Sequence, residues 1–364
     1  MDIYAASGHI MIENYRVPPI MLAFSFEIRY SRKQKHRMSF FINQILSQRS
    51  YMSHRHYFSI TFEWEDELSR QLGLPIVGEK RNVRHKIYKW IPGLPALFQT
   101  GVASFAYEMS PNINNRYNNK KNILPNIIDF YLHDSQLDTF CKEYRKNPAV
   151  LISSKEVYEH LKNRGVGEKL KLFHCALSLS DKYKISADTT FEKKEDLILL
   201  GRTNPVLQEF LDIYAKKHPD FTYAQSRRQG DEFHVYNNRG EHLGPATSRE
   251  DYMKMMKLSR CALYSPPGID GDENRTAGFS QITPRLLEIA ACGCNIIARY
   301  KMHADARFYE IDKLAANIDS YDEFESAMDK ARETPADMQM YADWLSKHYT
   351  SARAATIKSI LEQI

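Results

Sequence analysis

The sequence predicts an α/β protein with two doubly wound domains that face each other across a cleft. In the second half, short apolar runs that fit buried strands alternate with helices of about ten residues, which is typical of a parallel sheet covered by helices. A strand–helix–strand pattern also closes the first half, at residues 149–174. The length of 364 residues agrees, because one domain takes about 150. We expect domains at residues 1–188 and 189–335, followed by helices at 336–364 that cross back to the first domain.

The elements of the first half are the less regular ones. Apolar runs predict strands at residues 24–26, 57–62, 103–105, 127–132, 149–152 and 170–174. A helix is expected at residues 37–48, and Ser153 and Ser154 are suitable caps for a second helix. The asparagine-rich stretch 107–126 predicts a long loop, and the polar stretch 178–195 predicts the linker between the domains.

Four of the five predicted strands of the second half are followed by a helix with a recognisable start. The strands are expected at residues 196–200, 221–224, 261–264, 294–298 and 314–318. The helices between them begin at residues that cap a helix or suit its first turn, namely Asn204–Pro205, Ser248, Thr283–Pro284 and Tyr321. This regular alternation predicts a parallel sheet, in which ligands bind at the carboxyl ends of the strands.

Composition excludes several classes of protein. No apolar run reaches the ~20 residues that cross a bilayer, and the best candidate, residues 17–26, stops at Glu27. Residues 1–15 lack the basic start and apolar core of a signal peptide. The five cysteines follow no regular spacing, which argues against a disulfide framework. We therefore expect a protein of the reducing cytoplasm.

Charge is distributed unevenly along the chain. Residues 1–190 hold 27 basic and 18 acidic residues, a net charge of +9, whereas the rest hold 23 and 27, a net charge of −4. A basic first half fits an anionic acceptor or an anionic membrane surface at the inner face of the membrane. The alternative is a drift of surface charge without functional meaning.

The densest group of candidate ligand-binding residues lies between residues 264 and 288. The segment starts where a strand ends, passes through a polar loop and enters a helix. A helix start offers unpaired N–H groups, to which Thr283 adds a hydroxyl and Arg285 a fork of donors, so this is a site for a phosphate or diphosphate. Glu288, about one turn further on, can accept hydrogen bonds from two ribose hydroxyls. The alternative is a capped helix whose Arg285 and Glu288 form a surface ion pair.

Residues 283–298, TPRLLEIAACGCNIIA, resemble the donor-site helix and strand of nucleotide-sugar glycosyltransferases with the two-domain, Rossmann-like GT-B fold. The resemblance is strongest to the spore-protein and polysaccharide group of that class. Residues 196–202 are similar to the first strand and glycine turn of its donor domain, and residues 152–166 to the last β–α unit of its acceptor domain. In all, the resemblance covers about residues 127–332.

The resemblance implies roles for individual residues. Glu288 would bind the ribose, with Thr283 and Arg285 near the diphosphate. Gly201 would allow the donor phosphates to approach the backbone, and Arg202 would supply positive charge to the leaving group. Further candidates for the donor site are Arg228, Ser265, Asn274 and Arg275, with a solvated loop as the alternative for Arg228. The chain departs from many retaining members of the class at Ser280, where those members carry a sugar-contacting glutamate.

Candidates for the catalytic base come from the first half. His133 and Asp134 follow the predicted strand 127–132, and either could take a proton from an acceptor hydroxyl. The alternative is that Asp134 or Ser135 caps a helix. Glu63, with Glu65 two residues on, is a second candidate, and Glu27 is a weaker third.

No metal and no cofactor are expected. The chain has no Asp-x-Asp motif, Cys292 and Cys294 lack partners at metal-ligand spacing, and no P-loop or Gly-x-Gly-x-x-Gly motif occurs. Basic and aromatic residues alternate at 80–90, yet no nucleic-acid-binding module accompanies them, so nucleic acid is not expected as a partner.

These observations favour a metal-independent glycosyltransferase of the hexosyltransferase type. It would move a sugar from a UDP- or GDP-sugar to a saccharide, lipid-linked or protein acceptor, in the synthesis of a surface polysaccharide or glycoconjugate. It would be cytoplasmic, with a possible peripheral contact to an anionic membrane. The alternatives are a non-catalytic protein that holds a nucleotide or polyanion in the same cleft, and another GT-B-like enzyme such as an epimerase.

Overall fold

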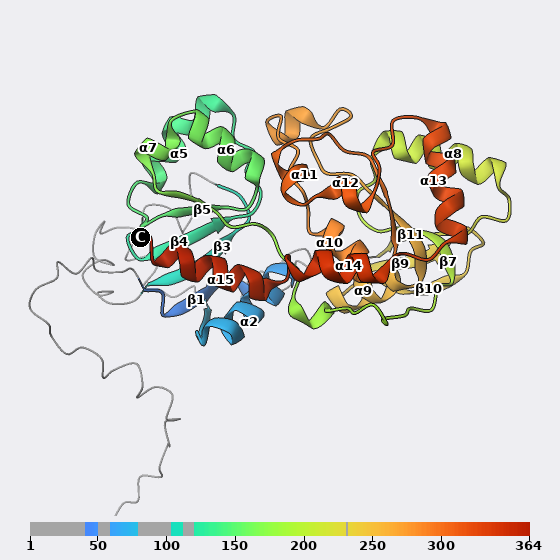
Figure 1. Cartoon of the computed structure of the whole chain (residues 1–364), viewed down its shortest axis with the longest axis horizontal. Helices are drawn as coiled ribbons and strands as arrows, with labels where there is room; N and C mark the ends of the chain where they lie inside the picture. Colours follow the sequence, from blue (N-terminus) through green and yellow to red (C-terminus); the bar gives the residue numbers. More distant parts are fainter. Residues whose placement is uncertain (1–40, 50–58, 79–102, 112–119, 231) are drawn as a thin grey trace, which may run out of the picture. The chain divides into compact units, whose positions relative to one another are not determined.

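The computed structural model describes residues 41–49, 59–78, 103–111, 120–230 and 232–364 (Figure 1). The predicted strand at 24–26, Glu27 and the basic segment 80–90 lie outside the described residues. The described residues contain two six-stranded sheets with helices packed against them, so the predicted α/β class with two doubly wound sheets is confirmed.

The first sheet has the strand order β2-β1-β3-β4-β5-β6, and all neighbouring strands are parallel. Its strands are β1 (Gln44–Ser47), β2 (Ile76–Gly78), β3 (Ser104–Glu108), β4 (Ile123–Ile127), β5 (Val150–Ile152) and β6 (Leu172–His174). Its helical segments are α2 (Ser59–Leu72), η3 (Asp134–Gln136), α5 (Leu137–Tyr144), α6 (Lys155–Asn163) and α7 (Val166–Lys169). Strands β3 and β4 are buried along their whole length, as expected for a parallel sheet covered on both faces.

The second sheet has the order β10-β9-β8-β7-β11-β12. Its strands are β7 (Glu195–Leu199), β8 (Tyr223–Gln229), β9 (Glu232–Asn237), β10 (His242–Pro245), β11 (Ser259–Tyr264) and β12 (Asn295–Ala298). Strands β8, β7, β11 and β12 are parallel, whereas β8, β9 and β10 form an antiparallel extension that the sequence analysis did not predict. Strand β10 of this extension is therefore one edge strand of the sheet.

The helices of the second half start largely where their caps predict. They are η4 (Asp181–Tyr183), α8 (Pro205–Lys217), α9 (Arg249–Lys257), η5 (Glu273–Thr276), α10 (Arg285–Ala291), α11 (Ala304–Phe308), α12 (Ile311–Leu314), α13 (Tyr321–Glu333), α14 (Met338–Ser346) and α15 (Thr350–Leu361). The Asn204 side chain accepts hydrogen bonds from two backbone amides of the first turn of α8. Ser154, Ser248 and Ser320 accept equivalent bonds at α6, α9 and α13. Helices α8 and α13 lie side by side against the sheet (Figure 1).

Four sequence predictions for local structure are wrong. Of the predicted strand 57–62, the described residues 59–62 belong to α2, because Trp64 and Leu68 are spaced to bury one helical face. Within the predicted helix 37–48, residues 44–47 form β1, whose Ile45 is fully buried between two parallel neighbours. Apolar content alone does not separate a short buried strand from a helix.

The other two errors concern strand position. The strand predicted at 127–132 lies at Ile123–Ile127, so all but its last residue falls in the stretch 107–126 that was expected to be a loop, as do the last two residues of β3. Pro125 and Asn126, which favoured a loop, occupy β4 itself. The strand predicted at 314–318 does not form: Leu314 ends α12, and Asn317 makes only an isolated bridge to Ala298.

The last helix, α15, packs on the core of the first sheet. Ala354, Ile357 and Ile360 are buried in the same cluster as Ile45 and Trp64, and α15 lies against α2 (Figure 1). The chain thus returns to the first sheet after it completes the second. Among the described residues, none of the helices combines the length and the apolar character that a bilayer-spanning helix requires.

Candidate functional site

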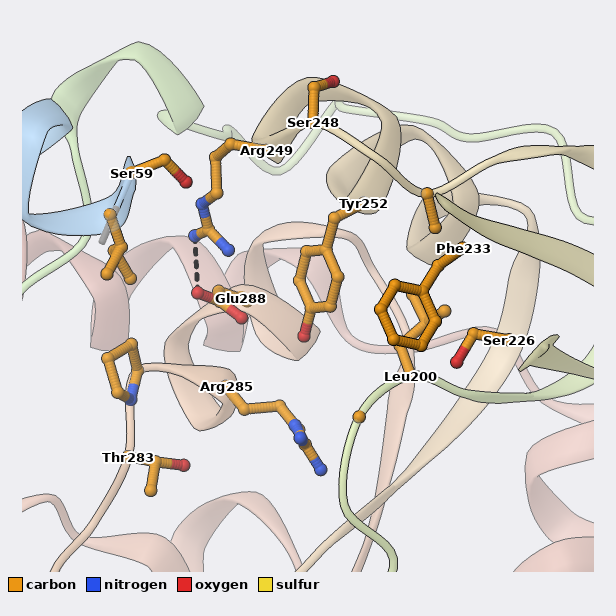
Figure 2. Close-up of a pocket in the computed structure, with 14 residues that line it drawn as sticks. Ser59, Leu200, Ser226, Phe233, Ser248, Arg249, Tyr252, Thr283, Arg285 and Glu288 are labelled. Atoms are coloured by element: carbon orange, nitrogen blue, oxygen red, sulfur yellow. Dashed lines mark ion pairs between the residues drawn. The ribbon is translucent and has the colours of Figure 1, made fainter. Parts of the chain in front are cut away.

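A cavity of about 370 Å³ opens at the carboxyl end of β7 (Figure 2). Leu200 and Gly201 line it where β7 ends, and the loop before α10 and the first turns of α9 and α10 form further walls. Ser226 and Phe233 of the antiparallel extension also line it, and so do Ser59 and Ile60 at the start of α2. The cavity therefore lies where ligands bind doubly wound sheets, with one side supplied by the first half of the chain.

Gly201 and Arg285 lie close together in this cavity. Gly201 has φ of +79°, and a Cβ atom built there would lie 2.3 Å from Arg285 Nη2. Arg285 Nη1 donates a hydrogen bond of 2.6 Å to the carbonyl oxygen of Arg202. The glycine thus allows the turn conformation and the close approach of the guanidinium, which holds positive charge at the end of β7.

The start of α10 completes this part of the cavity. Thr283 and Pro284 line it, and the Thr283 amide donates to the Tyr264 hydroxyl at the end of β11 (3.2 Å). Because Pro284 is the residue before the first helical turn, N–H groups at the helix start and the Arg285 side chain belong to one short segment. This arrangement is suited to an anion.

Glu288 is buried at the back of the cavity and faces Arg249. Arg249 Nη2 lies 2.5 Å from Glu288 Oε1, an ion pair drawn as a dashed line in Figure 2. The Tyr252 hydroxyl also hydrogen-bonds to Glu288, and burial followed by the Glu288 charge raises the pKa of this phenol. Glu288 is therefore paired with Arg249 and Tyr252 in the cavity, rather than in a surface ion pair with Arg285.

Glu63 lies on the other side of Arg249. Its Oε2 accepts a hydrogen bond from Arg249 Nε at 3.3 Å, and its Oε1 accepts from the Tyr183 hydroxyl and pairs with Lys182 Nζ, both at 2.8 Å. Glu63 does not line the cavity. With two cations and a phenol around it, this carboxylate serves to connect α2 to Arg249 and, through it, to Glu288. Its catalytic role stays a prediction.

His133 and Asp134 are exposed, and neither lines the cavity. Asp134 pairs with His160 Nε2 at 2.7 Å and with Arg164 Nη2 at 2.5 Å, and the hydrogen bond from His160 is the main cause of its lowered pKa. Asp134 is the first residue of η3, and the amide of His133 donates to the Gln136 side chain at 2.9 Å. A helical segment therefore does begin here, but its N-cap residue is His133 and not Asp134 or Ser135 as the alternative expected.

The loop after β11 contains Asp272, which forms ion pairs with the predicted donor-site residues Arg202 and Arg275. Arg202 and Arg275 both pair with Asp272, which Arg275 reaches at 2.6 and 2.7 Å. The pKa of Asp272 is held well below its usual range, mainly by Arg275. The Ser265 hydroxyl accepts from Asn204 at 3.2 Å, while Asn274 is exposed. Ser265, Arg202 and Arg285 line a small recess of about 10 Å³ at the same end of the sheet.

The antiparallel extension contributes different residues from those predicted. Arg228 is exposed and its Nε donates to the carbonyl oxygen of Gly230 at 2.9 Å. Ser226 and Phe233 line the cavity instead, together with Ala246 just beyond the extension. Sequence reasoning missed them because it did not predict β9 and β10. It also missed Arg249, which directly follows the correctly predicted cap Ser248.

A carboxylate of the first half approaches the same loop. Asp129 lies just past β4, and burial raises its pKa from 3.8 to about 6, against the opposing charge of Arg275. Two residues on, the Tyr131 ring lies 5.8 Å from the Arg275 guanidinium carbon. Asp129 is thus near Arg275, which shares Asp272 with Arg202, although Asp129, like His133 and Glu63, does not line the cavity. It was missed because it fell inside the predicted strand 127–132.

Within the described ranges, one group of carboxylate and imidazole side chains has the spacing of metal ligands. It consists of Glu156, His303 and Asp305, none of which lines the cavity. The candidate donor site and this group are therefore distinct.

Comparison with known proteins finds one family model that matches part of the second half. Residues 208–359 match the model of a family described as glycosyl transferase-like. This range includes Arg285, Glu288 and Arg249, so the predicted resemblance to glycosyltransferases is confirmed for this part of the chain. No curated protein sequence matches.

Several solved structures are similar at low identity. A trehalose-6-phosphate synthase is 13% identical with a TM-score of 0.49, over 87% of this chain and 85% of that one. A UDP-forming α,α-trehalose-phosphate synthase from Burkholderia xenovorans is 11% identical with a TM-score of 0.47, over 86% of each chain. A glycosyltransferase from Rickettsia africae is 10% identical with a TM-score of 0.47, over 88% of this chain and 97% of that one.

Proposed function

We propose that this protein transfers a sugar from a nucleotide-sugar to the hydroxyl of a saccharide acceptor, free or lipid-linked. The observation that carries the proposal is the convergence of Gly201, Arg285 and Glu288 on one cavity at the end of β7. The family match over residues 208–359 supports the same reaction class. The domain division at residues 188 and 335 is part of the proposal.

The leaving group would be a nucleoside diphosphate. Negative charge builds up on its outer phosphate as the bond to the sugar breaks, and fixed positive charge at that point lowers the barrier. Arg285 and the start of α10 supply it at the cavity, with Arg202 and Arg275 beside them. We propose that these groups act in place of a metal ion.

Glu288 and the antiparallel extension would hold the nucleoside. The Glu288 carboxylate can accept hydrogen bonds from ribose hydroxyls, while the ion pair with Arg249 orients it. Among the described residues, Phe233 is one of a small number of large apolar side chains that are exposed, and it borders the cavity, where a nucleobase can stack on its ring. A UDP-sugar or a GDP-sugar remains the proposed donor.

Asp129 is the proton acceptor that the geometry favours. A general base needs a pKa close to the working pH, and burial brings that of Asp129 to about 6. It also faces Arg275, on the donor side, whereas His133 is exposed and Asp134 is engaged with His160 and Arg164. Asp129 would accept the proton of the acceptor hydroxyl as that oxygen attacks the sugar.

The setting of the reaction belongs to the proposal as well. We propose a cytoplasmic enzyme of surface polysaccharide or glycoconjugate synthesis, whose basic first half contacts an anionic acceptor or the inner face of the membrane. No nucleic acid partner is proposed.

A panel of nucleotide-sugars tests the function. Each compound is added to the full chain, and both the melting temperature and the release of nucleoside diphosphate in the presence of mixed saccharide acceptors are measured. The proposal predicts that one donor class raises the melting temperature and is turned over, because a ligand that binds only the native state stabilises it. Stabilisation without turnover by any acceptor would favour the non-catalytic nucleotide-binding alternative.

A further inference from the structure

A second candidate site lies where α6, against the first sheet, meets α11 of the second half. Glu156 is in the first turn of α6, His303 directly precedes α11, and Asp305 is in its first turn. One potential ligand atom from each residue lies within 4.8 Å of the other two. The cluster is built from two parts of the chain about 150 residues apart, and α6 and α11 pack against each other.

The two carboxylates lack a cationic partner. Asp305 is buried and accepts hydrogen bonds from the Ser154 hydroxyl (2.7 Å) and from the Lys155 amide. Glu156 Oε2 accepts from the Ser280 amide at 3.0 Å. All these donors are neutral, and no described lysine or arginine forms an ion pair with either carboxylate.

The lack of a cationic partner for Glu156 and Asp305 differs from the arrangement beside the donor cavity. There, Glu63 and Glu288 share the guanidinium of Arg249, so each buried carboxylate has a cation at hand. Two neighbouring carboxylates without one are costly to bury, because nothing offsets their mutual repulsion and lost hydration. A bound cation would supply the missing charge.

His303 provides the observation that points to a ligand. Both ring nitrogens are buried, and neither has a hydrogen-bond partner. A neutral imidazole carries a lone pair on one ring nitrogen, which can bind a metal ion. A neutral imidazole nitrogen beside two carboxylate oxygens is a common ligand set for zinc.

Spacing agrees with this interpretation. His303 Nδ1 lies 3.5 Å from Glu156 Oε2. Two ligands on a tetrahedral ion with bonds of ~2.1 Å lie about 3.4 Å apart. The amide and hydroxyl groups that hold Asp305 and Glu156 would then act as the hydrogen-bonding partners that orient metal-bound carboxylates.

We propose that Glu156, His303 and Asp305 bind a zinc ion that joins α6 to α11, with water as the fourth ligand. The ion is structural: it links the two halves of the chain at a point separate from the donor cavity. This inference does not depend on the proposed sugar transfer, because none of the three residues lines that cavity.

Zinc binding to the full chain, stripped with a chelator and returned to buffer, tests the proposal. We expect about one zinc ion per chain by calorimetry and a higher melting temperature with zinc. Loss of an outer hydrogen-bonding partner typically weakens a metal site ~10- to 100-fold. We therefore expect His303→Ala, which loses a ligand, to weaken binding at least ~100-fold.

Two further variants make the result decisive. Glu156→Gln keeps an oxygen that can accept from the Ser280 amide, so it tests ligand loss with little risk to folding, and circular dichroism confirms the fold of each variant. His242→Ala is the control, because His234 and His242 form an exposed pair 3.0 Å apart that could bind zinc adventitiously. The proposal is overturned if folded His303→Ala and Glu156→Gln bind zinc as the natural chain does, or if His242→Ala alone abolishes binding.

Discussion

The carboxyl ends of the two sheets carry opposite chemistry. At the second sheet, arginines surround the strand ends, with Arg285 in the cavity and Arg202 and Arg275 beside it. At the first sheet, buried carboxylates follow or adjoin the strand ends: burial raises the pKa of Asp129 to about 6 and that of Glu65, bonded to Ser47 at the end of β1, to about 7.

This difference runs against the net charges of the two halves. The first half is basic overall and the second acidic, yet the groups at the strand ends have the reverse character. Surface charge therefore says little about a site, and the local arrangement of strand ends and helix starts decides it. The division fits the proposed sugar transfer, in which one side would stabilise a leaving diphosphate and the other would accept a proton.

Asp129→Asn should have the largest effect, because it removes the proposed base from the first sheet. A general base contributes ~100- to 10,000-fold in rate, so kcat should fall by that range while donor affinity stays within about twofold. Kinetics and donor titration check this, with Asp138→Asn, an exposed aspartate paired with Lys169, as the control.

His133, the base predicted from the sequence, provides a test of the assignment to Asp129. His133→Ala should leave kcat nearly unchanged if Asp129 is the base. A large loss of kcat in His133→Ala, at an unchanged melting temperature and with Asp129→Asn active, would return the base to His133 and remove Asp129 from the mechanism.

Gly201→Ala should weaken donor binding about 10- to 100-fold. The new Cβ atom would meet Arg285 Nη2 at 2.3 Å and would also strain a backbone with positive φ. Gly240→Ala is a matched control, since Gly240 has a similar φ of +85° and nothing within 4 Å of the added atom. Equal effects of the two substitutions on donor affinity would mean that the contact with Arg285 does not matter.

Glu288→Gln should weaken nucleoside diphosphate binding about tenfold. A hydrogen bond to a charged group contributes ~1.5–3 kcal/mol, part of which a neutral amide retains. Arg249 would also lose its partner in the cavity, so the melting temperature should fall. Calorimetry against Glu241→Gln, an exposed position, measures the difference, and unchanged affinity would exclude Glu288 from the donor site.

The pH dependence of kcat should report Asp129. Only the deprotonated carboxylate can accept a proton, and its pKa of about 6 is raised above the ordinary 3.8. The rate should therefore rise through pH 6 and level off above about pH 7, and at pH 5 it should be about tenfold below the plateau. A flat profile between pH 5 and 7, in protein that stays folded, would contradict this assignment.

Removal of divalent metal should have the smallest effect on turnover. Because Arg285 and the helix start are proposed to stabilise the leaving group, chelator should leave kcat unchanged at temperatures well below the melting temperature. Lower thermal stability after chelation is compatible with the proposed structural zinc site. Turnover that chelator abolishes and Mn²⁺ or Mg²⁺ restores would show that the leaving-group proposal is wrong.

The parts of the fold that sequence reasoning predicted carry local signals. Asn204, Ser248 and Ser320 cap their helices through contacts two or three residues away, so a short window contains the cause. Strand β1 and helix α2 were assigned to the wrong class because the burial of Ile45 and Trp64 depends on distant partners.

In the candidate site, too, some residues belong to a local sequence pattern, whereas others are brought together only by the fold. Thr283, Arg285 and Glu288 belong to one helix start, and Gly201 to one turn, so their pattern is visible in the sequence. The partnership of Glu288 with Arg249, and of Arg249 with Glu63, joins residues 39 and 186 positions apart. The approach of Asp129 to Arg275 also depends on how the two sheets meet, which no local pattern reports.

The most direct test of the account is a calorimetric titration of the full chain with UDP and with GDP, repeated on Arg285→Ala. We predict that one of the two binds at one molecule per chain and that Arg285→Ala weakens it ~10- to 150-fold, the equivalent of ~1.5–3 kcal/mol. Arg239→Ala, at a turn that does not line the cavity, should bind as the natural chain does. Binding that Arg285→Ala leaves unchanged would contradict the claim that the arginine-lined end of the second sheet holds the donor diphosphate.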